Sequence, residues 1–193
     1  MRKQQQAPGE LERVRAFVNT RDLEDGSDVL TTPDELRVWL IDQDLASGPL
    51  RVSPAAVRRA RALREAIREI LISHTEGAEP PPHACVTLDQ AAMKARLALR
   101  FDDRGAAKLE PAAGGVDGAL GRLLGVIQLA LADGTWARLK ACREQSCEWA
   151  FYDHTKNQSG AWCTMEVCGN RAKARAYRKR RPGPLPSSRP VKT

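Results

Sequence analysis

The sequence predicts a mainly α-helical protein. A multihelical N-terminal domain contains a small β-hairpin, and a short cysteine-rich module after it ends in a basic helix. Three observations predict this organisation: apolar residues at helical spacing through most of residues 10–135, one short alternating segment, and two cysteine pairs followed by a run of arginine and lysine. The 193 residues are 42% hydrophobic, which suits one domain with an appendage or two small domains and argues against wholesale disorder.

The first three helices are predicted from capping signals and apolar spacing. Residues 10–18 form the first, and Thr32 and Glu35 form a capping box that opens the second. Ser53 and Pro54 start the longest helix. Its apolar stripe comprises Val57, Ala60, Leu63, Ile67, Ile70 and Leu71. The charged residues off this stripe are typical of a solvated face with partial ion pairing: Arg58, Arg59, Arg61, Arg64, Glu65 and Arg68.

The rest of the N-terminal domain is predicted to contain two more helices and the hairpin. After a proline-rich loop at residues 80–82, Thr87 with Gln90 suggests the cap of a short helix. Residues 97–101 alternate, residues 102–105 suit a turn, and a second strand resumes at Lys108. Residues 116–132 form a strongly apolar helix, with five residues expected in the core: Leu120, Leu123, Leu124, Ile127 and Leu131. We therefore place the helical domain at residues 10–138.

Two cysteine pairs of equal spacing lie within residues 139–181, which we expect to form the second module. Cys142 and Cys147 form one C-x4-C pair, Cys163 and Cys168 form the other, and fifteen residues separate them. Four thiolates suit one structural zinc ion. Disulfides and uncommitted thiols are the alternatives. Cys85 and His154 are interpreted as bystanders.

The sequence gives little support for secretion or a membrane span. Residues 1–13 are polar and contain no apolar core of a signal peptide. The longest apolar stretch, Leu123 to Ala132, is about half the length that a bilayer crossing needs. We therefore expect a cytoplasmic protein that does not use a membrane, and its cysteines should be reduced.

The basic end of the chain predicts a polyanionic partner. Residues 169–193 contain nine basic and no acidic residues, whereas the preceding part is close to neutral. Asn170 is a candidate N-cap, Gly169 permits an unusual turn or a close approach, and Pro182 ends the helix. The candidate nucleic-acid contacts are Arg171, Lys173, Arg175, Arg178, Lys179, Arg180 and Arg181. A solubilising tail is the alternative, and the helix lacks the broad apolar face that membrane-surface binding needs.

Several motifs together resemble a known family. The two C-x4-C pairs, Phe151-Tyr152-Asp153, Trp162-Cys163 and Cys168-Gly169-Asn170-Arg171 resemble a CGNR zinc finger. Upstream, residues 17–21, 32–40 and 60–66 resemble the ABATE domain of bacterial stress-induced transcription regulators. The resemblance covers about residues 10–181. It implies one structural Zn²⁺, held by Cys142, Cys147, Cys163 and Cys168, in a DNA-binding module. The family commonly has basic residues before the Trp-Cys pair, where this chain has Gly160 and Ala161.

These observations lead to a functional hypothesis. We expect a DNA-binding transcription regulator, with Arg171 and Arg175 at base edges and Lys173, Arg178 and Lys179 at phosphates. The N-terminal domain would sense an unidentified small-molecule effector or form a homodimer. The alternative is a zinc-stabilised module that binds RNA or protein without operator specificity. We do not expect an enzyme, because four cysteines would close the metal site and no familiar catalytic motif is found. Residues 182–193 are expected to be a flexible tail.

Overall fold

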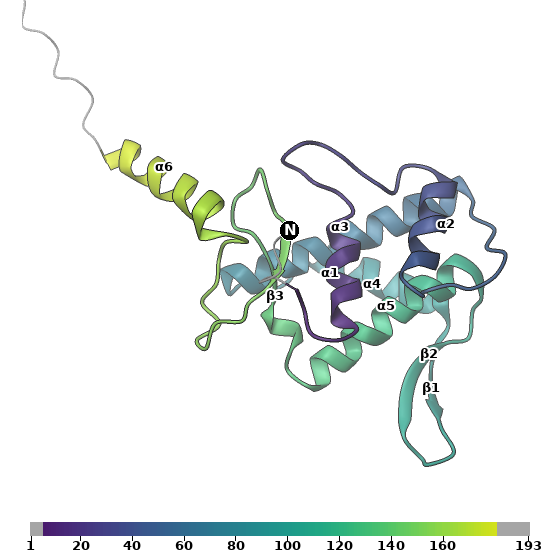
Figure 1. Ribbon diagram of the computed structural model, residues 1–193. Helices are drawn as coiled ribbons and strands as arrows, with labels where there is room; N and C mark the ends of the chain where they lie inside the picture. The colour runs from purple at the N-terminus through teal and green to yellow at the C-terminus, as the bar shows by residue number, and fades with distance from the viewer. Residues whose placement is uncertain (1–5, 181–193) are drawn as a thin grey trace, which may run out of the picture.

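The computed structural model describes residues 6–180, and it confirms the mainly α-helical fold with a small hairpin (Figure 1). The predicted tail and Arg181 lie outside this range, and for Arg180 only the backbone is described. The helices are α1 (Leu11–Val18), α2 (Pro33–Asp42), α3 (Pro54–Glu76), α4 (Pro82–Ala95), α5 (Gly115–Ala132) and α6 (Asn170–Arg180). The strands are β1 (Leu97–Phe101), β2 (Ala107–Pro111), β3 (Leu139–Ala141) and β4 (Ala150–Tyr152), paired as two separate antiparallel ladders.

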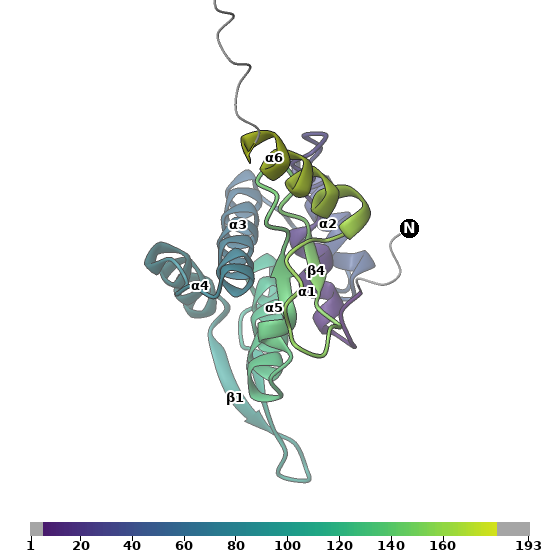
Figure 2. The same ribbon diagram turned by 90° about the vertical axis from the view of Figure 1, so that its left-hand side faces the viewer.

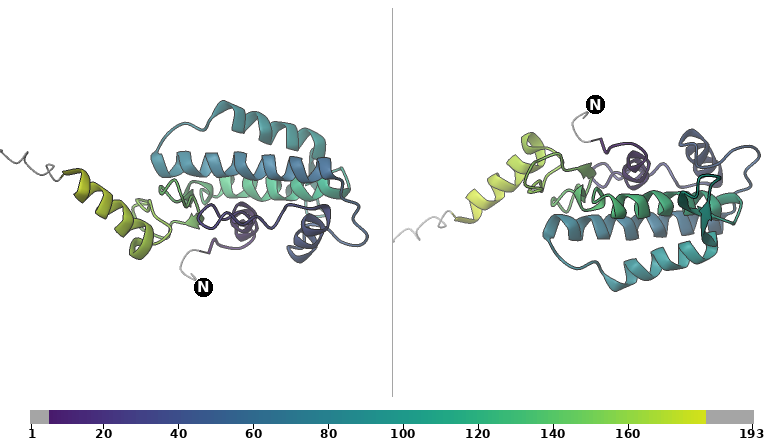
Figure 3. Two further views of the ribbon diagram at one scale, coloured as in Figure 1. Left: turned by 90° about the horizontal axis from the view of Figure 1, so that it is seen from above. Right: turned by 90° about the horizontal axis from the view of Figure 1, so that it is seen from below.

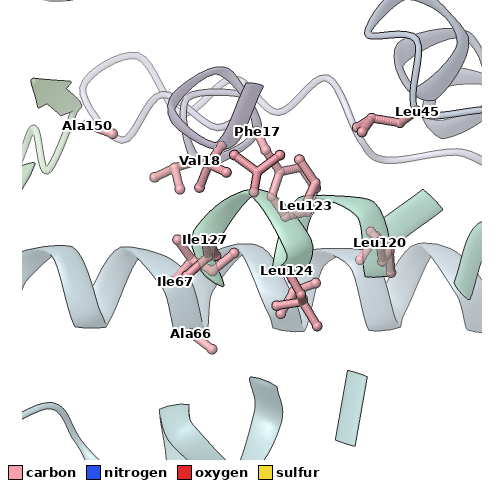
Figure 4. Close-up of a cluster of buried hydrophobic side chains, with 14 of the residues drawn as sticks. Phe17, Val18, Leu45, Ala66, Ile67, Leu120, Leu123, Leu124, Ile127 and Ala150 are labelled. Carbon is pink, nitrogen blue, oxygen red and sulfur yellow. The ribbon is translucent and has the colours of Figure 1, made fainter. Parts of the chain in front are cut away.

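The helices pack in layers around α3 and α5. Viewed from above, α4 lies on one side of this pair, and α1 and α2 lie on the other (Figure 3). Phe17 of α1, Ile67 of α3 and Leu123 of α5 are buried in a common core (Figure 4). Every residue of the predicted α3 stripe is buried. Leu131 was expected in the core, but it is 60% exposed because it lies on the solvent side of the last turn of α5.

In the N-terminal domain, the capping predictions held at two helices and were wrong at a third. The Thr32 hydroxyl accepts a hydrogen bond from the Glu35 amide at 3.2 Å, and the Glu35 carboxylate accepts one from the Thr32 amide at 2.8 Å. The Ser53 hydroxyl caps α3. Thr87 caps nothing, because α4 already starts at Pro82, and its hydroxyl donates to the carbonyl of His83 one turn back. Proline is favoured in a first helical turn, where its missing N–H costs nothing.

Two arginines that the sequence assigned to a solvated face are buried. The side chains of Arg64 and Arg68 are 0% and 2% exposed. Arg64 donates to both carboxylate oxygens of Asp28, at 2.7 and 2.8 Å. The interpretation was wrong because this side of α3 is covered by α1 and by the loop that carries Asp28. Arginine is tolerated there because carboxylates and carbonyls match its donors.

Helix α5 is apolar around most of its circumference. By length and composition it could cross a membrane, although 56% of it is buried inside the protein. A core helix passes the same test, so this is weak evidence of a membrane span. Here α5 packs against α1, α3, α4 and β2.

The first ladder, β1 with β2, extends away from the helices (Figures 1 and 2). Leu97 pairs with Pro111 at its base, and Phe101 pairs with Ala107 near its tip. Asp102 forms the predicted turn, since its carboxylate accepts from the amides of Arg104 and Ala106. The inner half of the hairpin contacts α5. A Cβ on Gly121 would lie 2.6 Å from the Ala95 side chain and 3.0 Å from that of Pro111, and a Cβ on Gly125 would lie 2.9 Å from the Leu109 carbonyl oxygen.

Candidate metal centre and basic helix

The four predicted cysteine ligands converge on one point. Cys142 and Cys147 lie on the loop between β3 and β4, and Cys163 and Cys168 flank the segment that leads into α6. All four side chains are buried, and all four sulfur atoms lie within 4.8 Å of one another. The Sγ atoms of Cys147 and Cys163 are 3.7 Å apart, as are those of Cys163 and Cys168.

This sulfur cluster has the dimensions of a tetrahedral zinc site. With Zn–S bonds of about 2.3 Å, the edge of an S4 tetrahedron is about 3.8 Å, close to the two separations above. Hydrogen bonds from Cys147 and Cys163 lower the pKa of the Cys142 thiol to about 2. Burial and the charge of Cys142 raise the pKa of Cys168 to about 12. Four thiolates repel one another, so a divalent cation would allow all four to ionise together. The chain can therefore hold one zinc ion here.

A second, small apolar cluster surrounds the sulfurs. It contains the four cysteines and Phe151, and the half-buried Trp149 and Trp162 pack against it. It is separate from the helical core, and so few apolar side chains cannot order a chain segment alone. This module therefore depends on the metal centre for its ordered structure.

A buried ion pair orders the long loop between β4 and Cys163. Lys140 Nζ donates to the Asp153 carboxylate at 2.9 Å, and both side chains are at most 5% exposed. Burial alone would raise the pKa of Asp153, but hydrogen bonds from Lys140 and Thr155 lower it to about 2. Gly160 donates its amide to the same carboxylate at 2.8 Å, and a Cβ there would lie 2.8 Å from that carboxyl group. Close approach to Asp153 therefore explains glycine at this position.

The metal module is docked on α3 and on the end of α1 by side chains that bond to its backbone. The Asn19 side chain accepts from the Ala150 amide at 2.8 Å and donates to the Ala150 carbonyl at 2.9 Å, so it extends β4 as a further strand residue would. The Thr75 hydroxyl donates to the Ala141 carbonyl at 2.6 Å. Arg68 donates to the Glu148 carbonyl at 2.9 Å. Because these contacts fix both ends of the Cys142–Cys147 loop, α1 and α3 position the first cysteine pair.

The helical path that leads into the basic helix starts inside the second cysteine pair. A π-helical turn, Met165–Gly169, precedes α6 with Thr164 at its N-cap position. Asn170 was predicted as the N-cap, but it has helical backbone angles and its side chain donates to the Glu166 carbonyl at 3.0 Å. The prediction was wrong because the helical path begins five residues earlier, as a wider turn around Cys168. A Cβ on Gly169 would lie 2.7 Å from the Met165 sulfur, but this is the end of a flexible side chain that is 52% exposed and can move aside, so the contact does not require glycine.

The predicted nucleic-acid contacts fall into two groups. Arg171 and Arg175, expected at base edges, form ion pairs with carboxylates outside α6. Arg171 pairs with Glu24 at 2.6 Å, and Arg175 pairs with the buried Glu144. Arg175 and Ser146 lower the pKa of the Glu144 carboxyl group, against its burial. Lys173, Arg178 and Lys179 are exposed, and no ion pair is found for them within residues 6–180.

Sequence reasoning missed the two carboxylates that hold α6. Glu24 lies in a loop far from the cysteines in sequence, and no local pattern marks it. Glu144 lies between Cys142 and Cys147, where an acidic residue against an arginine-rich helix could have suggested an ion pair. Arg143, which follows Cys142 in the sequence, donates to the Thr75 carbonyl of α3 at 3.2 Å.

An open groove lies beside the metal centre. It has a volume of about 1020 Å³ and is lined by residues 151–155 and 159–166. Tyr152, His154 and Trp162 contribute aromatic rings to its wall, and the rings of Tyr152 and His154 meet edge to face at 4.8 Å. His154, interpreted as a bystander, is exposed and bonded to the Gln6 carbonyl, while Cys85 is exposed on α4.

Two family models match adjoining parts of the chain. Residues 138–181 match a model described as "CGNR zinc finger". Residues 12–139, about two thirds of the chain, match the ABATE model, described as "Putative stress-induced transcription regulator". A search of curated proteins finds no match. The two matches confirm the predicted architecture.

Proposed function

Because the chain belongs to the ABATE family and ends in a CGNR zinc finger, we propose that it is a DNA-binding transcription regulator. In this proposal the zinc site is structural. It fixes the segment that leads into α6, and α6 presents its basic residues to the DNA backbone.

The observation that supports DNA binding best is the position of α6. The helix extends beyond the body from the sulfur cluster, with solvent around most of its surface (Figures 1 and 3). Lys173, Arg178 and Lys179 are exposed on it without carboxylate partners in the described chain. An α-helix of this width fits the major groove of DNA. DNA phosphates would neutralise these three positive charges, for which the rest of the described chain provides no carboxylate partner.

A salt titration tests the proposal. With five to seven phosphate contacts, log Kd against log salt concentration should change with a slope magnitude of about 4.5 to 6 for duplex DNA. The triple variant Lys173→Ala/Arg178→Ala/Lys179→Ala should bind much more weakly, while Lys94→Ala on the exposed side of α4 should bind like the wild type. Binding that ignores salt, or a triple variant with unchanged affinity, would refute the proposal.

RNA is the second candidate partner. The aromatic wall of the groove beside the metal centre favours it, because unpaired bases stack on aromatic side chains. Competition decides between the two. If structured or single-stranded RNA displaces duplex DNA at equal nucleotide concentration, and Trp162→Ala removes this advantage, the RNA function replaces the DNA function.

We infer a structural and not a catalytic metal. Four cysteine ligands complete a tetrahedral shell, whereas a catalytic zinc keeps a position for water or substrate. The N-terminal domain is then the regulatory part, which receives an effector or joins two copies. Spectroscopy of a cobalt-substituted protein tests the first point. Four-sulfur coordination is expected, and a ligand-exchangeable position would contradict it.

A further inference from the structure

The outer half of the β1–β2 hairpin has an apolar face that nothing in the described chain covers. Leu99 and Leu109 are cross-strand partners, as are Phe101 and Ala107, so they share one face of the ladder. Leu99 is 58% exposed and Phe101 is 68% exposed. A two-stranded hairpin that is open on both sides is marginally stable in water, so burial of this face against another surface would stabilise it.

The same face continues inward as a groove. The groove has a volume of about 290 Å³ and lies between the hairpin and α5. Leu109, Val126 and Leu129 form its apolar part, and Leu129 is 45% exposed. At the base of the hairpin, Leu97 and Pro111 pack on Gly121, and a Cβ on Gly125 would lie 2.9 Å from the Leu109 carbonyl oxygen, so the groove runs beside the contact between α5 and β2.

Each end of this hairpin has an exposed charge for which no ion pair is found among residues 6–180: Asp103 at the tip and Arg122 at the groove. The other charges at the two ends are of mixed sign. Arg104 also lies at the tip, Lys108, Glu10 and Glu110 also line the groove, and Arg13 there is paired with Glu10 at 3.0 Å. Arg122 is exposed, donates to the Leu45 carbonyl, and has no carboxylate partner among residues 6–180. In an antiparallel, face-to-face arrangement of two such hairpins, each tip meets the other's base, so opposite charges would meet twice.

We propose that this face joins two copies of the chain. The two hairpins would pack antiparallel about a two-fold axis, with Leu99 and Phe101 of each copy covering the groove of the other. Asp103 of one copy would lie near Arg122 of the other. The proposal depends on the hairpin alone and not on DNA binding. The hairpin and α6 extend from opposite ends of the molecule, so pairing through the hairpin would leave both basic helices accessible (Figure 2).

Sedimentation of the full-length, zinc-loaded protein without nucleic acid tests the proposal. The wild type should change from monomer to dimer as its concentration rises. Phe101→Ser should weaken dimerisation by about 100-fold, because a two-fold interface loses the buried ring twice. Val86→Ser is the matched control, since Val86 is 51% exposed but lies on α4 away from this face. It should dimerise like the wild type.

A charge exchange tests the pairing of tip and base. Asp103→Lys and Arg122→Glu should each weaken dimerisation, and the double variant should dimerise more tightly than either single variant. As a check that needs no variant, amide exchange in residues 97–111 of the wild type should slow as protein concentration rises. A monomer at all concentrations, a dimer insensitive to Phe101→Ser, or purely additive charge effects would overturn the proposal. So would slowed exchange that appears only when nucleic acid is added.

Discussion

Arg64 and Arg68 hold together a part of the interior that apolar residues alone do not explain. Arg68 donates to the Glu65 carboxylate and to the carbonyls of Val18, Arg21 and Glu148. Arg64 joins the same Glu65 to Asp28. Burial alone would raise the pKa of Glu65, but Arg68 and Arg64 lower it. Arg64 and Arg68 therefore connect α1, α3, the metal module and the loop after α1 that contains Arg21 and Asp28.

Removal of Arg68 should be strongly destabilising. Arg68→Met keeps a helix-forming side chain of similar length but leaves three carbonyls without their donor, which should cost about 3–5 kcal/mol of unfolding free energy. Arg58→Met on the exposed side of the same helix should cost less than about 0.5 kcal/mol. Urea unfolding of the zinc-loaded proteins measures both. Equal losses in the two variants would show that the buried contacts contribute nothing specific.

His74 should make stability depend on pH. Burial lowers its pKa, against the hydrogen bond that its Nδ1 donates to the Leu139 carbonyl. The unfolded chain therefore binds the proton more readily than the folded one below an unfolded pKa of about 6.5. The stability contributed by neutral His74 is complete above that pH. It is lost as pH falls through the folded pKa, by at most about 1.4 kcal/mol per pH unit.

Two glutamine variants test this linkage. His74→Gln should unfold with a flatter pH dependence than the wild type below about pH 6.5, whereas His154→Gln, at an exposed histidine, should keep the wild-type dependence. Thermal unfolding between neutral and mildly acidic pH provides the comparison. If the His74→Gln and wild-type curves stay parallel, His74 does not contribute to the acid response.

At the scale of an element, α6 is held at its base and exposed beyond it. Its contacts are with the π-helical turn, Glu24 and Glu144, and Ala172 is its half-buried residue among 171–179. Spacing along the sequence groups Arg171, Arg175 and Arg178 on one face, but the first two are ion-paired with the body. Among residues 171–179, the charges without a carboxylate partner are therefore those of Lys173, Arg178 and Lys179.

This division predicts unequal roles for two neighbouring basic residues. Lys173→Ala should reduce the slope magnitude of the salt dependence of DNA binding by about 0.9, the value for one phosphate contact. Arg171→Ala should reduce it by less, because Glu24 already neutralises Arg171 at 2.6 Å. Fluorescence anisotropy at several salt concentrations measures both slopes. A larger change for Arg171→Ala would mean that DNA displaces Glu24.

At the scale of the whole molecule, the described chain contains two buried clusters, the helical core and the sulfur cluster. The helical core also includes Leu139, Ala141, Ala150 and Tyr152, so the β3–β4 ladder is packed with the helices although it carries the first cysteine pair. The sulfur cluster is separate, and a metal replaces the missing apolar area. The helices should therefore keep their own core when zinc is lost, whereas the module should not.

Zinc removal should unfold the chain locally. After chelation, amides of residues 142–149 and 154–180 should exchange rapidly, while those of α3, α5 and the β3–β4 ladder stay protected by the helical core. Cys168→Ser should give the same pattern without a chelator, and Cys85→Ser, at the exposed cysteine of α4, should bind one zinc ion and behave like the wild type. Exchange mass spectrometry with metal analysis measures this. Protection of residues 142–149 and 154–180 without zinc would exclude a structural metal.

The sequence by itself determined the local features. The capping box at Thr32, the apolar stripe of α3, the hairpin turn at Asp102 and the two C-x4-C pairs each depend on residues close together in the chain, and each was predicted. Cysteine spacing was sufficient for the metal centre because a tetrahedral ion accepts few ligand sets.

Only the tertiary structure decided what covers each surface. Arg64 and Arg68 are buried because α1 and a distant loop lie over them. Leu131 is exposed because no element lies over it. Arg171 and Arg175 are paired because Glu24 and Glu144 approach from elsewhere in the chain. A helical pattern shows which residues share a face, but burial and ion pairing depend on partners distant in sequence, which local spacing does not specify.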